Sequence, residues 1–523
     1  MVGSILLLSG CTSTGGGADD IILVNGSEPA NPLTPGDTDE PGGFRILQAL
    51  YAGLVAYDEF GVAVPDVAQS ITPNEDNTVY TVKLRDGEDF TDGEPVTADS
   101  FVDAWDWIAL ASNKALNQRY FSDIVGFSAD ADASLITEGG LVVIDDRTFE
   151  IHLATPISDF PQRLGLPVFS PLPPAFFDDP SAFAEHPIGN GPYLIDGDDA
   201  WKHGNRIELV ANPGYHGQRK AQNGGVTMLF YDTLDTAYSD LLSGHLDVLD
   251  QLPESALATF EDELSDRDID GPGPTLESIT IPSTLPHFAG PEGTLRRLAI
   301  SMAFDRTAIV TDLFGVTRIA ARDFATPALV GFRGEVPGFG ALLYNEDLAK
   351  DAWERANLLA PWDGTFEIAY DSDGAQRDWV DTVAASISAT LGIDAAGKPY
   401  PSDAALQSAI DAGSVGSAYA GVIRGDYPSV TAFIGRYASD SPENTGQYKN
   451  LDFDALLGTA AKATTRSDRE AAYTRAQSTL LADLPALPLW NSTVQVGFGE
   501  GIEHVTIDWH GIPQYEAITK SGG

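Results

Sequence analysis

Residues 80–99 read YTVKLRDGEDFTDGEPVTAD, and this stretch decides the fold class. Tyr80, Val82 and Leu84 alternate with polar residues, which predicts a strand with one buried face. Thr97 precedes a segment in which apolar residues recur every three or four positions, so we expect Thr97 to be the N-cap of an amphipathic helix. A strand, a turn and a helix in succession indicate an α/β protein.

The same two periodicities continue on both sides of this stretch. Residues 21–24 form a short apolar run closed by Asn25 and Gly26, which predicts a buried first strand, and residues 149–153 repeat the alternation. Helical spacing recurs at residues 46–54, 101–108, 295–309, 380–391 and 472–480. Because no fixed period appears, the sequence argues against solenoid and propeller folds.

The composition is that of a large folded protein. The chain has 523 residues, 43% of them hydrophobic and 20% charged, which corresponds to roughly three to four domains of about 150 residues. Against 77 acidic residues stand 30 Lys and Arg, a formal net charge of -47. Such a charge repels a phosphate backbone, so we expect no nucleic-acid partner. We interpret the acidity as favouring solubility at a crowded or salty cell surface, with recognition of a cationic partner as the alternative.

The first residues predict export. Residues 5–10, ILLLSG, are an apolar segment ending in small residues and are too short to span a bilayer. Together with Cys11, the single cysteine, they resemble the lipobox of bacterial lipoproteins. The resemblance implies that Cys11 is lipidated and that residues 1–20 are a signal and a flexible tether. The pattern departs from lipoproteins in one respect, since the first basic residue is Arg45; a free thiol after a hydrophobic start is the alternative.

The sequence carries no catalytic or metal-binding motif. Its eight histidines are scattered without a His-x-x-x-His pair, and one cysteine offers no thiolate cluster. The Gly-x-Ser-x-Gly elbow, the phosphate-binding loop and the dinucleotide-binding glycine pattern are missing from the sequence. We therefore expect no enzyme, no cofactor and no metal site.

A series of motifs in fixed order resembles one family. The motifs are residues 50–58 (LYAGLVAYD), 61–68 (GVAVPDVA), 80–87, 90–99, 117–121 (NQRYF), 187–193 (PIGNGPY), 212–215 (NPGY), 241–248 (LLSGHLDV) and 296–306 (RRLAISMAFDR). They closely resemble the family 5 extracytoplasmic solute-binding proteins, the peptide-binding components of bacterial ABC importers. The resemblance extends from about residue 21 to about residue 500.

This resemblance implies a bilobal α/β clamshell of type II, cluster C, with an additional small domain inserted in the first lobe. Residues 21–44, 187–271 and 487–523 are expected to form domain I, residues 45–186 domain II, and residues 272–486 domain III, the second lobe. Breaks rich in Pro and Gly at residues 171–174, 271–274 and 484–488 are interpreted as crossovers between units. Surface loops within one large domain are the alternative.

The family's binding segment is similar to residues 421–428, GVIRGDYP. A receptor that buries an extended peptide needs a free strand edge and a carboxylate for the terminal ammonium. By resemblance, Asp426, followed by Tyr427, holds the α-amino group, while the main chains of Val422 and Arg424 pair with the ligand. Ile423 stands where many members have an aromatic residue. A solvated turn is the alternative for Asp426.

Further candidates have equally plain alternatives. The side chain of Arg424 either binds a ligand carboxylate or faces solvent or an acid of the protein. Glu28 resembles a position on the opposite side of the cleft, or it caps its own loop. Tyr120 and Trp490 are predicted as aromatic walls, with core positions as the alternative.

The function implied by the resemblance is the binding and delivery of a ligand without any chemical reaction. We expect a monomeric lipid-anchored receptor at the extracytoplasmic face of the membrane, which binds di- or oligopeptides and delivers them to an ABC permease and its ATPase by lobe closure. The same fold binding an oligosaccharide, a nickel chelate or haem is one alternative. An extracytoplasmic hydrolase and a signalling or cell-wall lipoprotein are others.

Overall fold

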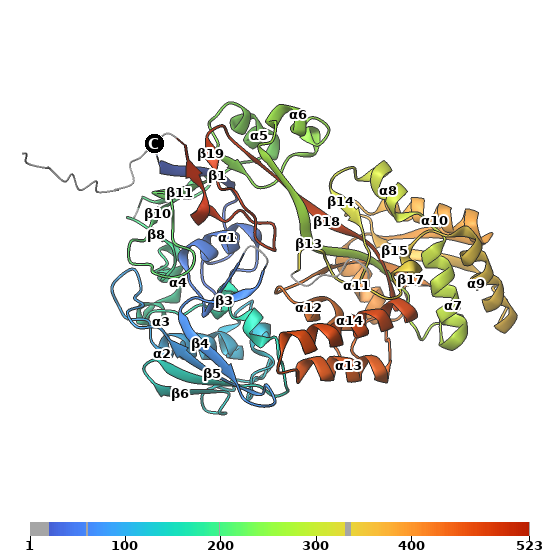
Figure 1. Cartoon of the computed structure of the whole chain (residues 1–523), viewed down its shortest axis with the longest axis horizontal. Coiled ribbons are helices and arrows are strands. Elements are labelled where there is room, and N and C mark those ends of the chain that lie inside the picture. Colours follow the sequence, from blue (N-terminus) through green and yellow to red (C-terminus); the bar gives the residue numbers. More distant parts are fainter. Residues whose placement is uncertain (1–19, 59–60, 198, 330–335, 522–523) are drawn as a thin grey trace, which may run out of the picture.

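The computed structural model describes residues 20–58, 61–197, 199–329 and 336–521. Most strands belong to one 12-stranded sheet, in the order β16-β15-β17-β13-β18-β12-β1-β11-β10-β8, with β14 paired to β18 and β9 to β10. Figure 1 shows that this sheet extends through two lobes joined by β13 and β18. The bilobal α/β architecture expected from the sequence is confirmed.

The first lobe contains one end of this sheet. Its strands are β1 (Ile21–Gly26), β8 (Tyr193–Ile195), β9 (Trp201–Lys202), β10 (Arg206–Ala211), β11 (Gly225–Phe230) and β12 (Val248–Leu249). The predicted first strand is confirmed as β1, which pairs in parallel with β11 and β12. Its helices and small hairpins are α1 (Pro41–Leu50), α3 (Pro174–Asp178), α4 (Pro180–Glu185), α5 (Leu234–Leu242), α6 (Phe260–Leu264), β2 (Val55–Tyr57) with β3 (Ala63–Pro65), and β19 (Ile502–Glu503) with β20 (Thr519–Lys520).

A separate four-stranded antiparallel sheet lies at the far end of the first lobe. Its order is β4-β5-β7-β6, formed by β4 (Ala68–Pro73), β5 (Val79–Leu84), β7 (Thr148–His152) and β6 (Leu141–Asp145). Tyr80, Val82 and Leu84 are all buried, as their alternation predicts. The helix α2 (Ala98–Ala109) covers this sheet, and Thr97 is its N-cap, with its backbone N–H 3.1 Å from Ser100 Oγ.

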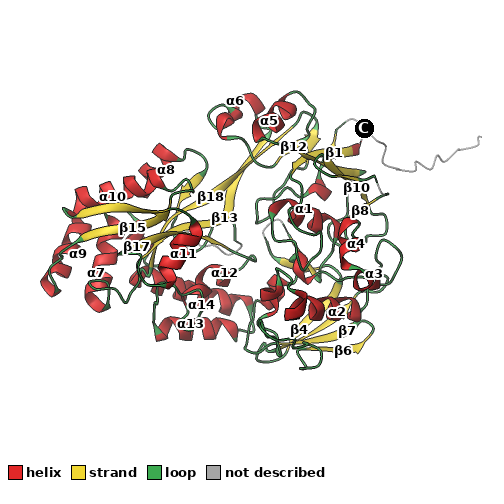
Figure 2. Ribbon diagram, turned by 180° about the vertical axis from the view of Figure 1, so that it is seen from behind, coloured by secondary structure: helices red, strands yellow, loops and turns green. Residues whose placement is uncertain are grey.

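The second lobe surrounds the other end of the large sheet with helices on both sides (Figure 2). Its strands are β14 (Arg318–Ala320), β15 (Thr365–Asp371), β16 (Asp394–Tyr400) and β17 (Ala418–Arg424). Its helices are α7 (Gly290–Met302), α8 (Arg306–Leu313), α9 (Glu346–Leu359), α10 (Arg377–Leu391), α11 (Asp403–Asp411), α12 (Thr431–Ile434), α13 (Leu451–Ala461) and α14 (Arg466–Asp483). The single helix expected over residues 295–309 is wrong, because the Asp305 carboxylate accepts from the backbone N–H groups of Thr307 and Ala308 and starts a second helix.

Eight short 3-10 helices complete the described part of the chain. They are η2 (Ala111–Asn113), η3 (Gln118–Phe121), η4 (Phe160–Arg163), η5 (Pro167–Phe169), η6 (Glu254–Ala256), η7 (Phe339–Leu342), η8 (Gly435–Tyr437) and η9 (Tyr515–Ala517). The two largest buried apolar clusters fill one lobe each.

Two long antiparallel strands, β13 (Asp268–Thr280) and β18 (Ala486–Phe498), cross between the lobes. They pair from Asp268 to Pro272 and again from Leu276 to Thr280, with an irregularity between these blocks. The breaks predicted at residues 271–274 and 484–488 fall in or just before these strands. The crossover predicted at residues 171–174 is wrong: this segment stays beside α2, where the Leu172 N–H donates to Ser100 O at 3.0 Å. The three domain ranges stay a prediction.

One carboxyl group lies in the core of the second lobe. Asp323, fully buried, accepts from the Phe324 N–H at 2.6 Å and from the Gln477 amide on α14. Burial raises the pKa of Asp323 to about 7, because the apolar surroundings disfavour the charged form. The fold therefore favours the neutral acid.

We expect Asp323→Asn to change the pH dependence of stability. Between about pH 4 and pH 7 the folded chain holds a proton here that the unfolded chain has released, so stability falls as pH rises through this window, by up to about 1.4 kcal/mol per pH unit. An amide cannot ionise, and Gln477 can turn its own amide toward it. Urea unfolding should show the variant more stable than the wild type at pH 8, with the gap shrinking toward pH 5. Asp130→Asn, at an exposed position, is the control. A stability difference between Asp323→Asn and the wild type that does not change with pH contradicts a raised pKa at Asp323.

Candidate functional site

The predicted binding segment comprises the end of β17 and the turn that follows it. β17 pairs with β13 from Tyr419 to Arg424, whereas its ladder with β15, within the described part of the chain, contains only Ala418 and Tyr419. Beyond Tyr419, therefore, one edge of β17 has no strand beside it. An edge strand directs half of its backbone N–H and C=O groups outward, where an extended ligand can pair with them.

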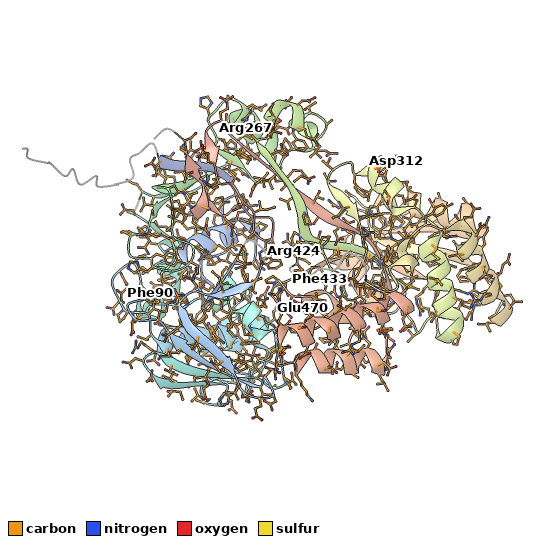
Figure 3. All side chains as sticks on the ribbon, in the orientation of Figure 1. Phe90, Arg267, Asp312, Arg424, Phe433 and Glu470 are labelled. Atoms are coloured by element: carbon orange, nitrogen blue, oxygen red, sulfur yellow. The ribbon has the colours of Figure 1, made fainter. Side chains whose placement is uncertain are left out.

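The side chains of this strand alternate between solvent and core. Val422 is 54% exposed and Arg424 is exposed, while Ile423 is 5% exposed and packs in the core of the second lobe. Figure 3 places Arg424 between the two lobes, at the end of its strand. Ile423 was predicted as a site residue, but its side chain faces away from the exposed face, so only its backbone is available there.

Asp426 lies in the turn after β17 and faces the first lobe. Its side chain is 47% exposed, and its Oδ1 lies 3.7 Å from Nη2 of Arg119 on the other lobe. Arg119 in turn donates to the Tyr120 hydroxyl at 3.1 Å. Burial raises the pKa of Tyr120, and the nearby Asp426 carboxylate adds to this effect. The structure thus brings together Asp426 and Tyr120, which came from separate motifs, through an arginine that sequence reasoning missed although it stands in the same motif as Tyr120.

Tyr427 fastens the segment to the first lobe. It is 8% exposed, its ring lies 4.7 Å from the Arg163 guanidinium, and its hydroxyl lies 3.3 Å from Arg163 Nη2. Arg163 also forms an ion pair with Asp123. Burial raises the pKa of the Tyr427 phenol. These contacts occupy Tyr427, so its side chain positions the turn and does not face an open site.

A second carboxylate of the first lobe holds the continuation of the turn. Asp159, 3% exposed, accepts from the hydroxyls of Ser429, Thr431 and Tyr473, the last two at 2.9 and 3.2 Å. Burial raises the pKa of Tyr473 well above its usual range. Segment 427–431 is therefore held across the lobes on both sides of Pro428, leaving Asp426 and Arg424 exposed.

Two other predicted residues lie elsewhere. The Glu28 carboxylate accepts from the Gly204 N–H and contacts His203 Nδ1, both at 2.8 Å, so it caps the β9–β10 turn of its own lobe. The structure does not bring it to Asp426. Trp490 is 0% exposed and packs against Phe314 and Trp379 in the second-lobe core. Its prediction as a wall of the cleft is wrong.

The described residues contain no group of three or more His, Cys, Asp and Glu side chains placed to hold a metal ion. Among the helices that the structure describes, none combines the length and the apolar character required to cross a bilayer. Cys11 lies outside the described residues.

Fold and site together define a two-lobed binding protein, with an unpaired strand edge and a carboxylate facing across the space between the lobes. The profile of the bacterial extracellular solute-binding proteins, family 5 Middle, matches residues 62–445, and the chain belongs to this family. The resemblance seen in the sequence motifs is thereby confirmed.

Individual relatives match along most of their length. "Probable deoxycholate-binding periplasmic protein YgiS" of Escherichia coli (strain K12) is 26% identical over 498 residues, covering 89% of this chain and 86% of that protein. Periplasmic oligopeptide-binding protein OppA of Salmonella typhimurium is 26% identical over 492 residues, covering 90% and 87%. The unliganded open form of the periplasmic murein tripeptide-binding protein MppA shares the fold, with a TM-score of 0.84, 21% identity and coverage of 98% and 99%.

The Asp159 contacts give a stability prediction. Asp159→Ala removes the shared acceptor of three hydroxyls; because Thr431 also bonds the Tyr473 hydroxyl and Ser429 also bonds Thr431, about one donor is left unsatisfied, and we expect a loss of about 1–3 kcal/mol in the free energy of unfolding. Tyr473→Phe removes one donor and should cost less. Asp130→Ala, at an exposed position, is the control in the same urea titration. Equal stability of Asp159→Ala and the control would show that the network does not hold the lobes.

Proposed function

We propose that this protein captures short peptides outside the cytoplasm and presents them, chemically unchanged, to an ABC permease. The observation that carries the proposal is the exposed Asp426 carboxylate directly after the unpaired edge of β17. The carboxylate complements a terminal ammonium, and the strand edge complements the donors and acceptors of an extended backbone.

The names of the relatives support a peptide ligand, and one of them suggests deoxycholate as the main alternative. OppA is named for oligopeptides and MppA for a murein tripeptide, whereas YgiS is named for deoxycholate. Deoxycholate has neither an ammonium group nor a peptide backbone, so it complements the carboxylate and the strand edge less well than a peptide does. The site therefore favours a peptide.

Binding proceeds by exchange of partners at Asp426. In the absence of ligand, Arg119 is the nearest cation, but the separation of 3.7 Å and the exposure of both side chains make this contact weak. A peptide ammonium replaces Arg119, and the peptide backbone extends β17 by one strand. Contacts from both lobes then favour the closed arrangement, whose shape the permease recognises.

The remaining features of the proposal follow from the sequence. Cys11 is the lipidation site that attaches the protein to the outer face of the membrane, the protein acts as a monomer, and it catalyses no reaction. The three domain ranges expected from the sequence belong to the same proposal.

A thermodynamic cycle tests the ammonium contact. Calorimetric titration should show that Asp426→Asn binds Ala-Ala-Ala about 10- to 100-fold more weakly than the wild type, because a charge-assisted hydrogen bond is lost. N-acetylated Ala-Ala-Ala should lose a similar factor with the wild type and little more with the variant. Asp130→Asn is the control for the loss of one negative charge. Full affinity of the acetylated peptide for the wild type would place the amino terminus elsewhere, and a response to deoxycholate alone would overturn the peptide assignment.

Lobe closure has a signature of its own. Saturating peptide should reduce the radius of gyration measured by small-angle X-ray scattering, because the lobes rotate together about β13 and β18. Asp426→Asn at the same peptide concentration should stay nearer the ligand-free value. An unchanged radius in the wild type, at a concentration where calorimetry shows saturation, contradicts delivery by closure.

A further inference from the structure

The free guanidinium of Arg424 points to a more specific ligand, and this inference rests on the peptide function proposed above. Within the described part of the chain, Arg424 makes no side-chain hydrogen bond, ion pair or ring contact, and its side chain is exposed. The chain has 77 acidic residues against 30 Lys and Arg, so an exposed arginine has many potential partners. An arginine left without a carboxylate in such a protein is available to a ligand.

Its place in the strand aims it at the ligand. The burial pattern of β17 puts Val422 and Arg424 on the exposed face and Ile423 in the core. Arg424 ends β17 and Asp426 lies two residues later in the turn, so their Cα atoms are at most about 7 Å apart. A peptide whose amino group lies at Asp426 therefore has its first three residues within reach of this guanidinium, between the lobes where Figure 3 shows it.

The charges around the site require an anion once a peptide is bound. Asp426 lies 3.7 Å from Arg119 across the lobes, and Arg424, two residues earlier in the chain, has no carboxylate partner among the described residues. When a ligand ammonium takes Asp426, Arg119 keeps its bond to the Tyr120 hydroxyl but loses its nearby carboxylate, and Arg424 still has none among the described residues. Two other acids of this region are already engaged: Glu443, which also acts on Arg119, contacts Arg436 at 3.2 Å, and Asp159 accepts from three hydroxyls.

The neighbouring Arg163 does not change this balance, because it forms its own ion pair with Asp123. Closing the lobes removes water from these groups, and desolvated charges are stable only when they are paired. A ligand that brings an ammonium alone leaves Arg119 and Arg424 without a carboxylate as the lobes close.

We propose that Arg424 selects peptides that carry a carboxylate within their first three residues. The group is either an acidic side chain at position two or three or the terminal carboxylate of a di- or tripeptide. A guanidinium binds a carboxylate through two parallel N–H···O bonds, so an amide in the same place is a poor substitute. Arg119, released from Asp426, adds to the attraction from the other lobe.

Four peptides separate the two sources of the carboxylate. Ala-Glu-Ala-NH2 and Ala-Gln-Ala-NH2 differ only in a side-chain charge, and Ala-Ala-Ala and Ala-Ala-Ala-NH2 differ only at the carboxyl terminus. Calorimetry on the wild type should show that at least one carboxylate peptide binds about 10- to 100-fold more tightly than its amide partner. The pair that shows the gap identifies which carboxylate Arg424 binds.

Variants of Arg424 test whether this residue causes the difference in affinity between a carboxylate peptide and its amide partner. Arg424→Gln should reduce it to less than about threefold while the amide peptides keep their wild-type affinity, and Arg424→Lys should retain part of it. Arg355→Gln is the matched control, since it removes an exposed arginine on α9. The inference is overturned if neither pair shows a gap, or if Arg424→Gln keeps it.

The test also distinguishes this inference from the function on which it rests. Suppose the amide peptides bind, Asp426→Asn weakens their binding, and neither peptide pair differs in affinity. The proposed peptide function is then supported, and the preference for a carboxylate is ruled out. If none of the four peptides binds the wild type, both fail together.

Discussion

The pairing of β13 with β18 is the constraint on which the rest of the structure depends. Each strand has 13 residues and belongs to both lobes, so their ladder joins the lobes and fixes their order. Pro272, which ends the first block, and Pro274, which follows it, cannot donate to a ladder, and a Cβ on Gly273 would lie 2.4 Å from Ser492 Oγ. The irregularity is therefore built into the sequence. It is one of two register shifts in this ladder; the other lies between Glu277 and Ser278.

The position of the site follows from this connection. β17 pairs with the second block of β13, and the turn that carries Asp426 follows β17 directly, beside residues of the first lobe. First-lobe groups then hold that turn: Arg163 contacts Tyr427, and Asp159 accepts from Ser429 and Thr431. A turn fixed on its far side can present a charged side chain at little further entropic cost, which favours tight binding of a flexible ligand.

Local periodicity predicted most of the helices and strands whose formation depends on residues close by in the sequence. β1, β5 and α2 with its N-cap Thr97 depend on neighbours within a few residues, and the sequence contains those neighbours. The break before α8 was missed because the apolar spacing continues across Asp305, and only the capping bonds show where the helix stops. The placement of Glu28 against His203, 175 residues away, depends on tertiary folding, which periodicity does not encode.

The same limit applies to the site. Asp426 and Arg424 could be named from one contiguous motif, whereas Arg119 reaches Asp426 only because two lobes meet. Trp490 and Ile423 have residue types found in both cores and pockets, and their burial depends on which face of a strand packs inward. A motif therefore identifies which backbone binds, while the direction of each side chain has to come from the packed structure.

The net charge of -47 and the arginines of the site act at different distances. At physiological ionic strength, charges separated by more than about 8 Å are largely screened, so the acidic surface repels a carboxylate ligand only weakly until it is close. In the proposed peptide complex, Arg119 and Arg424 lie near the bound peptide, and closure of the lobes excludes water from them. Screening by salt weakens the distant repulsion more than the short, desolvated contacts. An acidic protein can therefore bind an acidic peptide, and added salt is expected to reduce its affinity less than it would for a receptor whose attraction is spread over an exposed basic surface.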